Sequence, residues 1–464
     1  MAKKVSVLLL SAFFATADMY SDNISGSWHG TLQVTPQVSL KIGLNIETSS
    51  DGDATASLDS PDQGAYGIAG EIRHISQDSI DVAIPGINAG FAGRKVDENI
   101  RGKFRQGSMS LNLVLSPGKW QVNRPQTPVP PFPYTTEEIK FKNGKDSTIL
   151  AGTLTLPPDA TTNTPIAVMV TGSGLQNRDE ELFGHKPFAV IADYLARNGI
   201  GTLRYDDRGF GESTGDAKDA TLADFAGDAK SAVAFLRDMS FNHIGIIGHS
   251  EGARIAFMLA GKQMPETGPD EVIFYPGRPD FIVTLGAPSV RGDSILADQS
   301  AAQLRQSGMP ESIIADYSDA LIKMYGHFGE MNKEELKALV DAICSQWPNN
   351  PIYASLKANL KQIIDNSGPY LEYFVKHSPA QSIASTKCPA LAIYGGRDIQ
   401  VSPALNLDRM KELAPSAKVN LYPDLNHLFQ HAATGAVQEY AAIEETISPE
   451  VLADIAAFIN SLKR

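Results

Sequence analysis

The sequence predicts a small all-β domain followed by a larger α/β domain, whose mostly parallel sheet is covered by helices on both faces. Three observations lead to this prediction. In residues 18–122 apolar side chains recur at every second position, residues 123–133 hold five prolines, and from Tyr134 onward short apolar runs alternate with amphipathic ones. Strict alternation is typical of strands buried on one face. Strands that alternate with helices favour a parallel sheet between two helix layers.

Length and charge narrow the possible classes of protein. A chain of 464 residues has room for two or three domains and a large core. The formal net charge of −13 gives no overall attraction for nucleic acid or for an anionic membrane. After the first 17 residues, no apolar run is long enough to cross a membrane. The two cysteines, Cys344 and Cys388, do not make a disulfide scaffold, although an oxidising compartment would permit one bridge.

Residues 1–17 resemble a secretory signal sequence. Lys3 and Lys4 form a charged start, residues 5–14 are mostly apolar, and Ala15-Thr16-Ala17 fits the small-residue pattern of a cleavage site. We favour this interpretation over a buried first strand. We therefore predict an exported protein, periplasmic or secreted, whose signal peptide is cleaved after Ala17.

The N-terminal domain, residues 18–122, shows its clearest strand patterns at residues 40–46, 80–84 and 109–115. Turn-forming pairs such as Asp51-Gly52 separate these runs. We expect a small antiparallel sandwich or barrel. The stretch from Gly26 to Gly30 contains Trp28 and resembles the G-x-W start of lipocalin-like barrels. Trp28 is expected to fill the core rather than to contact a ligand.

The proline-rich segment 123–133 is predicted to be a stiff, extended linker, so the catalytic domain would comprise residues 134–464. Residues 290–378 interrupt its alternation of strands and helices. We predict that they form a helical lid inserted after the sixth strand, although several of their aromatic residues would serve ordinary packing. The expected strands are 138–141, 149–156, 166–170, 201–205, 243–248, 281–285, 390–394 and 418–422, and the expected helices include about 187–198, 222–239, 252–261 and 449–462.

The pattern G-x-S-x-G occurs at residues 248–252, between an apolar run and an amphipathic run. A strand, a sharp turn and a helix in this order are typical of a nucleophile elbow, in which the serine stands on a strained turn. The flanking glycines are needed because side chains there would clash. Ser250 is therefore the predicted nucleophile. A serine hydroxyl is a poor nucleophile alone, so this interpretation requires a histidine base and an acid that orients it.

Both partners follow Ser250 in the order that such a fold requires. Asp398 comes directly after the predicted strand 390–394, and His427 comes just beyond the last one. The carboxyl ends of parallel strands meet at one edge of a sheet, where catalytic groups gather. We therefore predict Asp398 as the acid and His427 as the base. Asp293 follows the sixth strand, where some hydrolases keep the acid, and remains an alternative to Asp398.

An oxyanion hole needs two backbone donors beside the nucleophile. The N–H of Glu251, directly after Ser250, is the first expected donor. The second is expected from the small-residue loop that begins at Thr171. Ser173 occupies the donor position of the H-G-x-G loop of lipases, and Gly174 remains an alternative because Thr171 replaces the histidine.

Other titratable residues are expected to have structural roles. Asp206 and Asp207 should pair with Arg208 and shape their loop, and the side chain of His249 should point away from the nucleophile. His185 is expected in a loop. His427 and His431 have an i, i+4 spacing that could hold a metal ion. The sequence has no H-E-x-x-H pattern around them and no evident third ligand, so we predict no metal site.

Four motifs together resemble those of the serine α/β-hydrolases, and in particular of secreted bacterial carboxylesterases with a β-rich N-terminal region. They are T-G-S-G-x-Q-x-R at 171–178, Y-D-x-R-G-x-G-x-S at 205–213, G-H-S-E-G at 248–252 and L-N-H-L-F at 425–429. The resemblance covers residues 134–464 and implies an α/β-hydrolase fold with a triad of Ser250, Asp398 and His427. It does not define the substrate, because this branch contains esterases, thioesterases and aminopeptidase-like members.

The sequence thus predicts an exported serine hydrolase that cleaves small-molecule acyl esters through an acyl-enzyme and needs no cofactor. The aromatic and methionine side chains of residues 290–378 favour the binding of an apolar acyl chain, which is stabilised by burial. A charged peptide terminus would lose its hydration in such a pocket without gaining a partner of opposite charge. One alternative is a peptidase or a thioesterase on the same triad. Another, of a different class, is lipid or glycan binding by the N-terminal domain. No nucleic-acid partner and no membrane span are expected.

Overall fold

The computed structural model describes residues 24–35, 38–48, 54–63, 65–120, 123–261 and 277–462. The predicted signal sequence, residues 1–17, lies outside this part of the chain. The chain divides into two compact units, Met1–Gln121 and Val122–Arg464, each of which has its own apolar core. Within the described residues no helix is both long and apolar enough to span a membrane.

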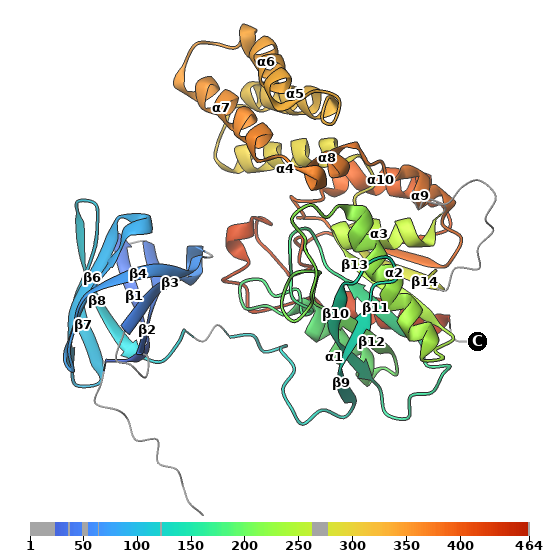
Figure 1. Ribbon diagram of the computed structural model, residues 1–464, viewed down its shortest axis with the longest axis horizontal. Helices are drawn as coiled ribbons and strands as arrows, with labels where there is room; N and C mark the ends of the chain where they lie inside the picture. The colour runs from blue at the N-terminus through green and yellow to red at the C-terminus, as the bar shows by residue number, and fades with distance from the viewer. Residues whose placement is uncertain are drawn as a thin grey trace, which may run out of the picture. The chain divides into compact units, whose positions relative to one another are not determined.

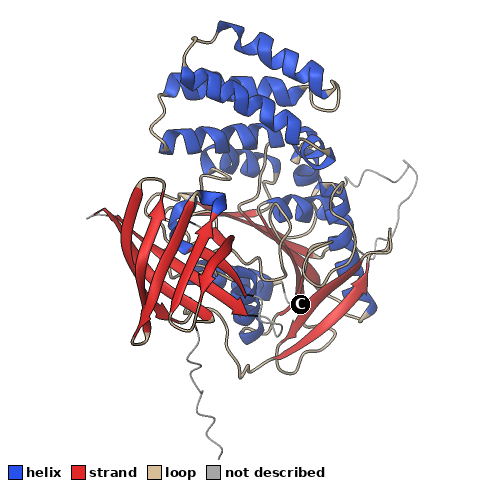
Figure 2. Ribbon diagram, turned by 60° about the vertical axis from the view of Figure 1, so that its left-hand side comes forward, coloured by secondary structure: helices blue, strands red, loops and turns tan. Residues whose placement is uncertain are grey.

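The first unit is a closed barrel of eight strands, each antiparallel to the next, with β8 pairing back to β1 (Figures 1 and 2). Alternation of inward and outward residues places Trp28, Leu44 and Phe91 in the core. The indole of Trp28 donates to the carbonyl of Ile24 at 2.7 Å. Trp28 thus fills the core, as expected. The strands are β1 (Gly26–Thr35), β2 (Val38–Thr48), β3 (Ala54–Ser60), β4 (Ala65–Ile75), β5 (Ser79–Ile84), β6 (Ala89–Val96), β7 (Asn99–Gln106) and β8 (Met109–Pro117).

The second unit contains an eight-stranded sheet in the order β16-β15-β14-β13-β11-β12-β10-β9. Strands β9 and β10 run antiparallel at one edge, and the other neighbours from β12 to β16 are parallel. Strands β11, β13, β14 and β15 are buried on both sides, which explains their largely apolar sequences, whereas β16 at the edge is partly exposed. The strands are β9 (Thr135–Lys142), β10 (Ile149–Leu156), β11 (Ile166–Val170), β12 (Gly201–Tyr205), β13 (Ile244–His249), β14 (Phe281–Leu285), β15 (Ala390–Gly395) and β16 (Lys418–Tyr422).

Helices cover both faces of this sheet, as the sequence predicts. One apolar layer contains Leu222, Ile255 and Met410 from α2, α3 and α10, and the other contains Phe188 and Ile455 from α1 and α11. The helices are α1 (Pro187–Arg197), α2 (Leu222–Asp238), α3 (Glu251–Ala260), α10 (Pro403–Leu413) and α11 (Pro449–Ser461).

A helical insertion, α4 to α9, separates β14 from β15 and agrees closely with the predicted range 290–378 (Figure 1). It has an apolar core of its own, in which Tyr325, Phe328 and Leu360 are buried. Cys344 is buried there as a free thiol, and Cys388 before β15 is also free. The helices are α4 (Gly292–Gln306), α5 (Glu311–Gly326), α6 (Lys333–Ile343), α7 (Pro351–Asn366), α8 (Pro369–Lys376) and α9 (Ala380–Ser385).

The proline-rich segment 123–133, predicted to be a linker, belongs to the second unit. The guanidinium of Arg124 donates to the carbonyl oxygens of Phe183, Ala441 and Ile443, at 2.9, 2.9 and 2.6 Å. These carbonyls come from loops far apart in the sequence, so a contact of this kind leaves no local pattern. The boundary between the units therefore lies just before this segment.

Candidate active site

Ser250 stands on a strained turn between β13 and α3, with φ 53° and ψ −111°. A positive φ is costly for a residue with a side chain and persists only where the surrounding structure enforces it. Here the N–H of Ser250 donates to the carbonyl of Leu285 at 2.7 Å, which ties the turn to the end of β14.

The two glycines that flank Ser250 are required by close packing of backbones. A Cβ at position 248 would lie 2.2 Å from the carbonyl oxygen of Gly252, and one at position 252 would lie 2.1 Å from that of Val170. Neither contact is possible for a larger residue. The two glycines of the G-x-S-x-G pattern thus allow the start of α3 to pack closely against the backbones of β11 and β13.

His427 and Asp398 form a buried pair, in which the Nδ1 of His427 lies 2.7 Å from the Oδ2 of Asp398. The other carboxylate oxygen, Oδ1, accepts the N–H groups of Gln400 and Val401, both at 2.8 Å. These two bonds fix the carboxylate, so that Oδ2 faces the imidazole. Asp398 follows β15 and His427 follows β16, the strand ends at which they are predicted.

The competing acid, Asp293, lies in a different environment. Its carboxylate pairs with Arg291 and accepts the N–H of Ser294 at the start of α4. Directly after β14 the chain has Gly286 instead, where an added Cβ would lie 3.3 Å from the His427 ring and 3.4 Å from the Oδ2 of Asp398. The acid that faces His427 is therefore Asp398.

Ser250 and His427 line the same cavity, whose volume is about 510 Å³. Its walls combine the loop after β11, the loops after β12, β15 and β16, and helices α4 and α8 of the insertion. The lining residues are Gly172, Ser173, Leu175, Gln176, Asn177, Glu180, Glu181, Leu182, Phe210, His249, Ser250, Leu296, Gln299, Tyr370, Leu371, Phe374, Gln400, His427 and Leu428.

Comparison with known proteins finds a matching family and distant relatives. The family described as serine aminopeptidase, S33, matches residues 186–274. Esterase EstD of Thermotoga maritima is 25% identical over 289 residues, which cover 61% of this chain and 59% of the esterase. An acyl transferase of Photobacterium leiognathi is 34% identical over 76 residues, which cover 16% of this chain and 24% of the transferase. The chain thus spans less than two thirds of the length of either relative.

Solved structures with a similar fold include an esterase of Pyrococcus furiosus, with a TM-score of 0.41 and 17% identity over 75% of this chain and 100% of that one. A proline iminopeptidase of Mycobacterium smegmatis has a TM-score of 0.41 and 16% identity over 70% of this chain and 98% of that one. The order of the strands in the sheet, the strained serine after β13 and the family match agree. The second unit has an α/β-hydrolase fold.

The loop after β11 is held close to Ser250, since a Cβ added at Gly172 would lie 3.3 Å from the Cβ of Ser250. The N–H of Gly172 donates to the Oε1 of Glu180 at 2.7 Å and is therefore occupied. Ser173, the predicted oxyanion residue, comes next along the loop and lines the cavity. Its hydroxyl lies 3.5 Å from the carboxylate of Glu251.

The side chain of Glu251, the other predicted oxyanion residue, is buried and accepts a hydrogen bond from the hydroxyl of Tyr370 on α8. Burial raises the pKa of the Glu251 carboxyl, although Tyr370 and the charge of nearby Arg254 act in the opposite direction. This contact joins the residue after the nucleophile to the helical insertion. The two residues are 119 positions apart, so no local pattern of the sequence predicts this contact.

His249 lies at the site, contrary to the expectation that its side chain points away. Its Nδ1 lies 2.9 Å from the Oε1 of Glu180, and its Nε2 lies 3.0 Å from the backbone oxygen of His427. Burial lowers the pKa of His249, but Glu180, the backbone oxygen of His427 and Asp398 together outweigh burial, so the pKa is raised overall. The pair of His249 and Glu180 thus fixes the backbone of the predicted base.

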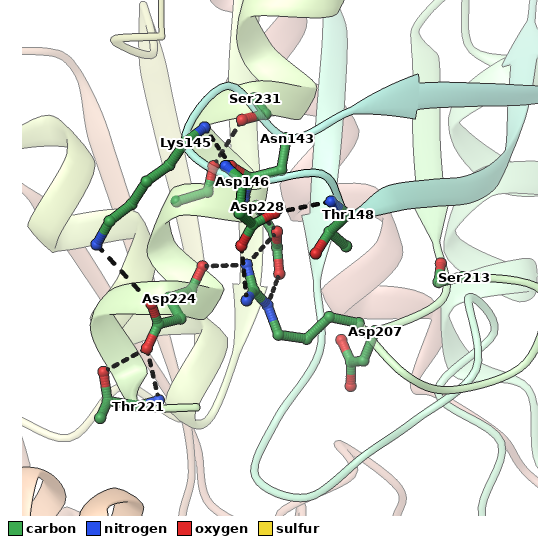
Figure 3. A network of polar contacts seen from close by, with 12 residues as sticks. Asn143, Lys145, Asp146, Thr148, Asp207, Ser213, Thr221, Asp224, Asp228 and Ser231 are labelled. Atoms are coloured by element: carbon green, nitrogen blue, oxygen red, sulfur yellow. Dashed lines mark hydrogen bonds and ion pairs between the residues drawn. The ribbon is translucent and has the colours of Figure 1, made fainter. Parts of the chain in front are cut away.

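The expected local pairing of Arg208 with Asp206 and Asp207 is wrong. Arg208 donates to the carboxylate of Asp228 on α2, at 2.6 and 2.8 Å, and lies 3.2 Å from Asp146 (Figure 3). Asp206 instead pairs with Arg178, at 2.8 Å. Side chains of successive residues at the end of a strand point in opposite directions, so adjacent residues such as Asp206 and Asp207 contact different partners.

Asp207 turns toward the loop after β11 rather than toward Arg208. Its carboxylate accepts the hydroxyl of Thr171 at 2.9 Å and the N–H of Gln176 at 2.8 Å. Burial raises the pKa of Asp207 to about 7, which outweighs the two hydrogen bonds that favour its charged form. Asp207 therefore fixes the shape of the loop that carries Ser173.

His185 and His431 both have partners outside the pair of His427 and Asp398. His185 is fully buried between Thr446 and the backbone oxygen of Tyr440, and burial lowers its pKa to about 4. His431 lies 2.9 Å from Glu445, whereas His427 faces Asp398, so the two do not converge on a common point. In the described part of the chain, no three acidic, histidine or cysteine side chains are grouped as a metal site.

Proposed function

We propose that the α/β-hydrolase unit cleaves carboxylic esters through an acyl-enzyme on Ser250. The observation that carries this proposal is one cavity that contains both the strained Ser250 and the imidazole of His427, whose far nitrogen is fixed by Asp398. A nucleophile, a base and an orienting carboxylate in this arrangement are the requirements of acyl transfer. The likeness to Esterase EstD supports an ester as the substrate.

In this mechanism the Nε2 of His427 accepts the proton of Ser250 as Oγ bonds to the ester carbonyl carbon. The carbon–oxygen bond to the alcohol then breaks, and His427 returns the proton to the departing alcohol. Water attacks the acyl-enzyme, gives its proton to His427 and releases the acid, after which the proton returns to Ser250. Asp398 holds the imidazole in the tautomer that these transfers need and stabilises its charged form.

We assign the oxyanion hole to the backbone N–H groups of Glu251 and Ser173, with Gly174 as the alternative on the loop. The bond from Gly172 to Glu180 supports this choice, because it removes the preceding N–H from competition. The buried contacts of Asp207 and His249 would hold this loop and His427 in position during turnover.

We further propose that the helical insertion acts as a lid. Leu296 on α4 and Leu371 and Phe374 on α8 form an apolar part of the cavity wall, which suits an acyl chain of short to medium length. Gln299 and Gln400 add neutral polar groups. A neutral ester fits this lining better than a charged peptide terminus does.

An aminopeptidase would need a carboxylate free to bind the substrate ammonium. The two glutamates of the lining are both engaged, Glu180 by His249 and Gly172, and Glu181 by Lys186 at 3.5 Å. Hydrolysis of p-nitrophenyl esters of increasing acyl length, compared with aminoacyl arylamides, tests the choice. We expect a higher kcat/KM for esters; faster cleavage of arylamides than of any ester would make this a peptidase.

Export remains part of the proposal, since the signal-like residues 1–17 are its sole support. N-terminal sequencing of protein recovered from the producing cell should find Asp18 as the first residue. A chain that still begins at Met1 would contradict export.

A further inference from the structure

Three neighbouring barrel strands, β6, β7 and β8, contain no acidic residue within their bounds, although the whole chain carries a net charge of −13. They lie side by side in the sheet (Figure 1). Their inward residues, such as Phe91 and Phe104, fill the core. Their outward residues form what we call the basic face: Ala92, Arg94, Arg101, Lys103, Arg105, Ser110, Asn112 and Val114.

Strand register concentrates positive charge on this face. Arg101, Lys103 and Arg105 alternate along β7 and are all exposed, about 7 Å apart. Arg94 on β6 lies directly opposite Arg101. Like charges in directly opposite positions destabilise a sheet. Within the part of the chain that the structure describes, none of these four cations forms an ion pair with a carboxylate. Stability of the barrel therefore does not explain the arrangement.

Exposed aliphatic side chains accompany these cations. Val114 lies on the basic face, directly across from Arg101 on the neighbouring strand, and is 46% exposed. Val96, at the end of β6, is 43% exposed. Binding of single-stranded nucleic acid would instead use exposed aromatic residues on which bases stack. Cations combined with aliphatic residues that can enter the boundary of the acyl chains are typical of proteins that bind at the surface of a bilayer.

A cleft of about 210 Å³ adjoins the basic face and is lined by Arg73, Arg105 and Asp81, over the small residues Gly90 and Ala92. Two arginines in one cleft can hold a phosphate group by charge-assisted hydrogen bonds. The negative carboxylate of Asp81 would repel a phosphate group that carries two negative charges. The cleft therefore suits one monoanionic phosphodiester better than a phosphate monoester.

We propose that the basic face docks the protein on an anionic phospholipid surface, with the cations at the headgroups and Val114 at the acyl boundary. The argument is independent of the proposed esterase activity. The net charge of the whole chain does not oppose it, since exposed charges farther away than about 8 Å are largely screened at physiological salt. The chain therefore has a negative net charge but a locally positive surface on the barrel.

Co-sedimentation of the full chain with phosphatidylglycerol–phosphatidylcholine vesicles tests this proposal, with vesicles of phosphatidylcholine alone as the comparison. We expect binding to the anionic vesicles and its loss in about 1 M salt. The triple variant Arg101→Gln/Lys103→Gln/Arg105→Gln should weaken the partition by about a hundredfold. Val114→Ser should weaken binding at low salt further, because less apolar surface then enters the acyl boundary.

A matched control removes the same charge elsewhere. Lys323→Gln/Lys357→Gln/Lys361→Gln changes three lysines of the helical insertion and should leave vesicle binding unchanged. Unchanged circular dichroism and an unchanged urea unfolding profile would show that both triple variants fold. Equal loss in the two variants, binding to phosphatidylcholine alone, or retention on heparin without vesicle binding would each overturn the proposal.

Discussion

The barrel and the sheet of the second unit each contain eight strands. Only the second sheet brings the candidate catalytic side chains together at one edge. In the barrel every strand runs antiparallel to its neighbours, so strand ends alternate between the two rims. In the hydrolase sheet the strands from β12 to β16 run parallel, so the loops after them meet at one edge. Ser250, Asp398 and His427 come from three such loops. Strand direction thus decides where reactive groups can converge.

The two units also treat charge differently. The hydrolase unit buries ionised groups and pairs them, as with Arg208 and Asp228 (Figure 3) or His249 and Glu180. The barrel leaves Arg94, Arg101 and Lys103 exposed and unopposed on one face. Buried pairs fix the geometry of a site, whereas exposed like charges are available to a partner. The predictions below test this division of roles.

The largest effect is expected at the nucleophile. Ser250→Ala should lower kcat for a soluble ester by about 10⁶-fold and abolish labelling by a fluorophosphonate probe, because no acyl-enzyme can form. The fold should persist, since alanine is smaller than serine at a position whose backbone is fixed by Leu285. Residual turnover within about tenfold of the parent would show that another residue carries the reaction.

The orienting acid comes next. Asp398→Asn should lower kcat by about 10⁴-fold, because the amide would favour the wrong tautomer of His427. Asp293→Asn serves as the matched control and should have a much smaller effect, since Asp293 pairs with Arg291 instead. The reverse ranking in steady-state kinetics would assign the acid to Asp293.

Removal of the barrel separates the two units. A chain that starts at Val122 should hydrolyse a soluble ester as the full chain does, because the cavity is lined by residues of the second unit. A chain that starts at Tyr134 also loses Arg124, whose three bonds to carbonyls join separate loops. It should be less stable by about 3 kcal/mol in urea unfolding. Equal stability of the two chains would show that segment 123–133 is a dispensable linker.

The smallest effect concerns pH. The pKa of Asp207 is raised by burial to about 7, above its usual value of 3.8. The folded state therefore binds more protons than the unfolded state between these values, and the contribution of Asp207 to stability falls as pH rises through this window. Asp207→Asn should flatten the decline of the urea midpoint between about pH 4 and pH 7. A variant with the same slope as the parent would contradict this role.

Much of this architecture is determined by local sequence. The alternation along 80–84 and 109–115 depends only on which face of each strand is buried, and the strand and helix succession after Tyr134 depends on the same local periods. The turn at Ser250 is similarly local, because glycines two positions before and after it permit the close approach of three backbones. Such features can be predicted because neighbours in the sequence carry all the information.

The tertiary structure alone decided the pairings between distant segments. Arg208 has two acidic neighbours in the sequence, yet pairs with Asp228, which the packing of α2 brings to it. His249 was expected to point away, yet it supports the backbone of His427 from 178 positions earlier in the chain. Partners of this kind depend on how strands are ordered in a sheet and on which groups are desolvated together. No local period of the sequence encodes either property.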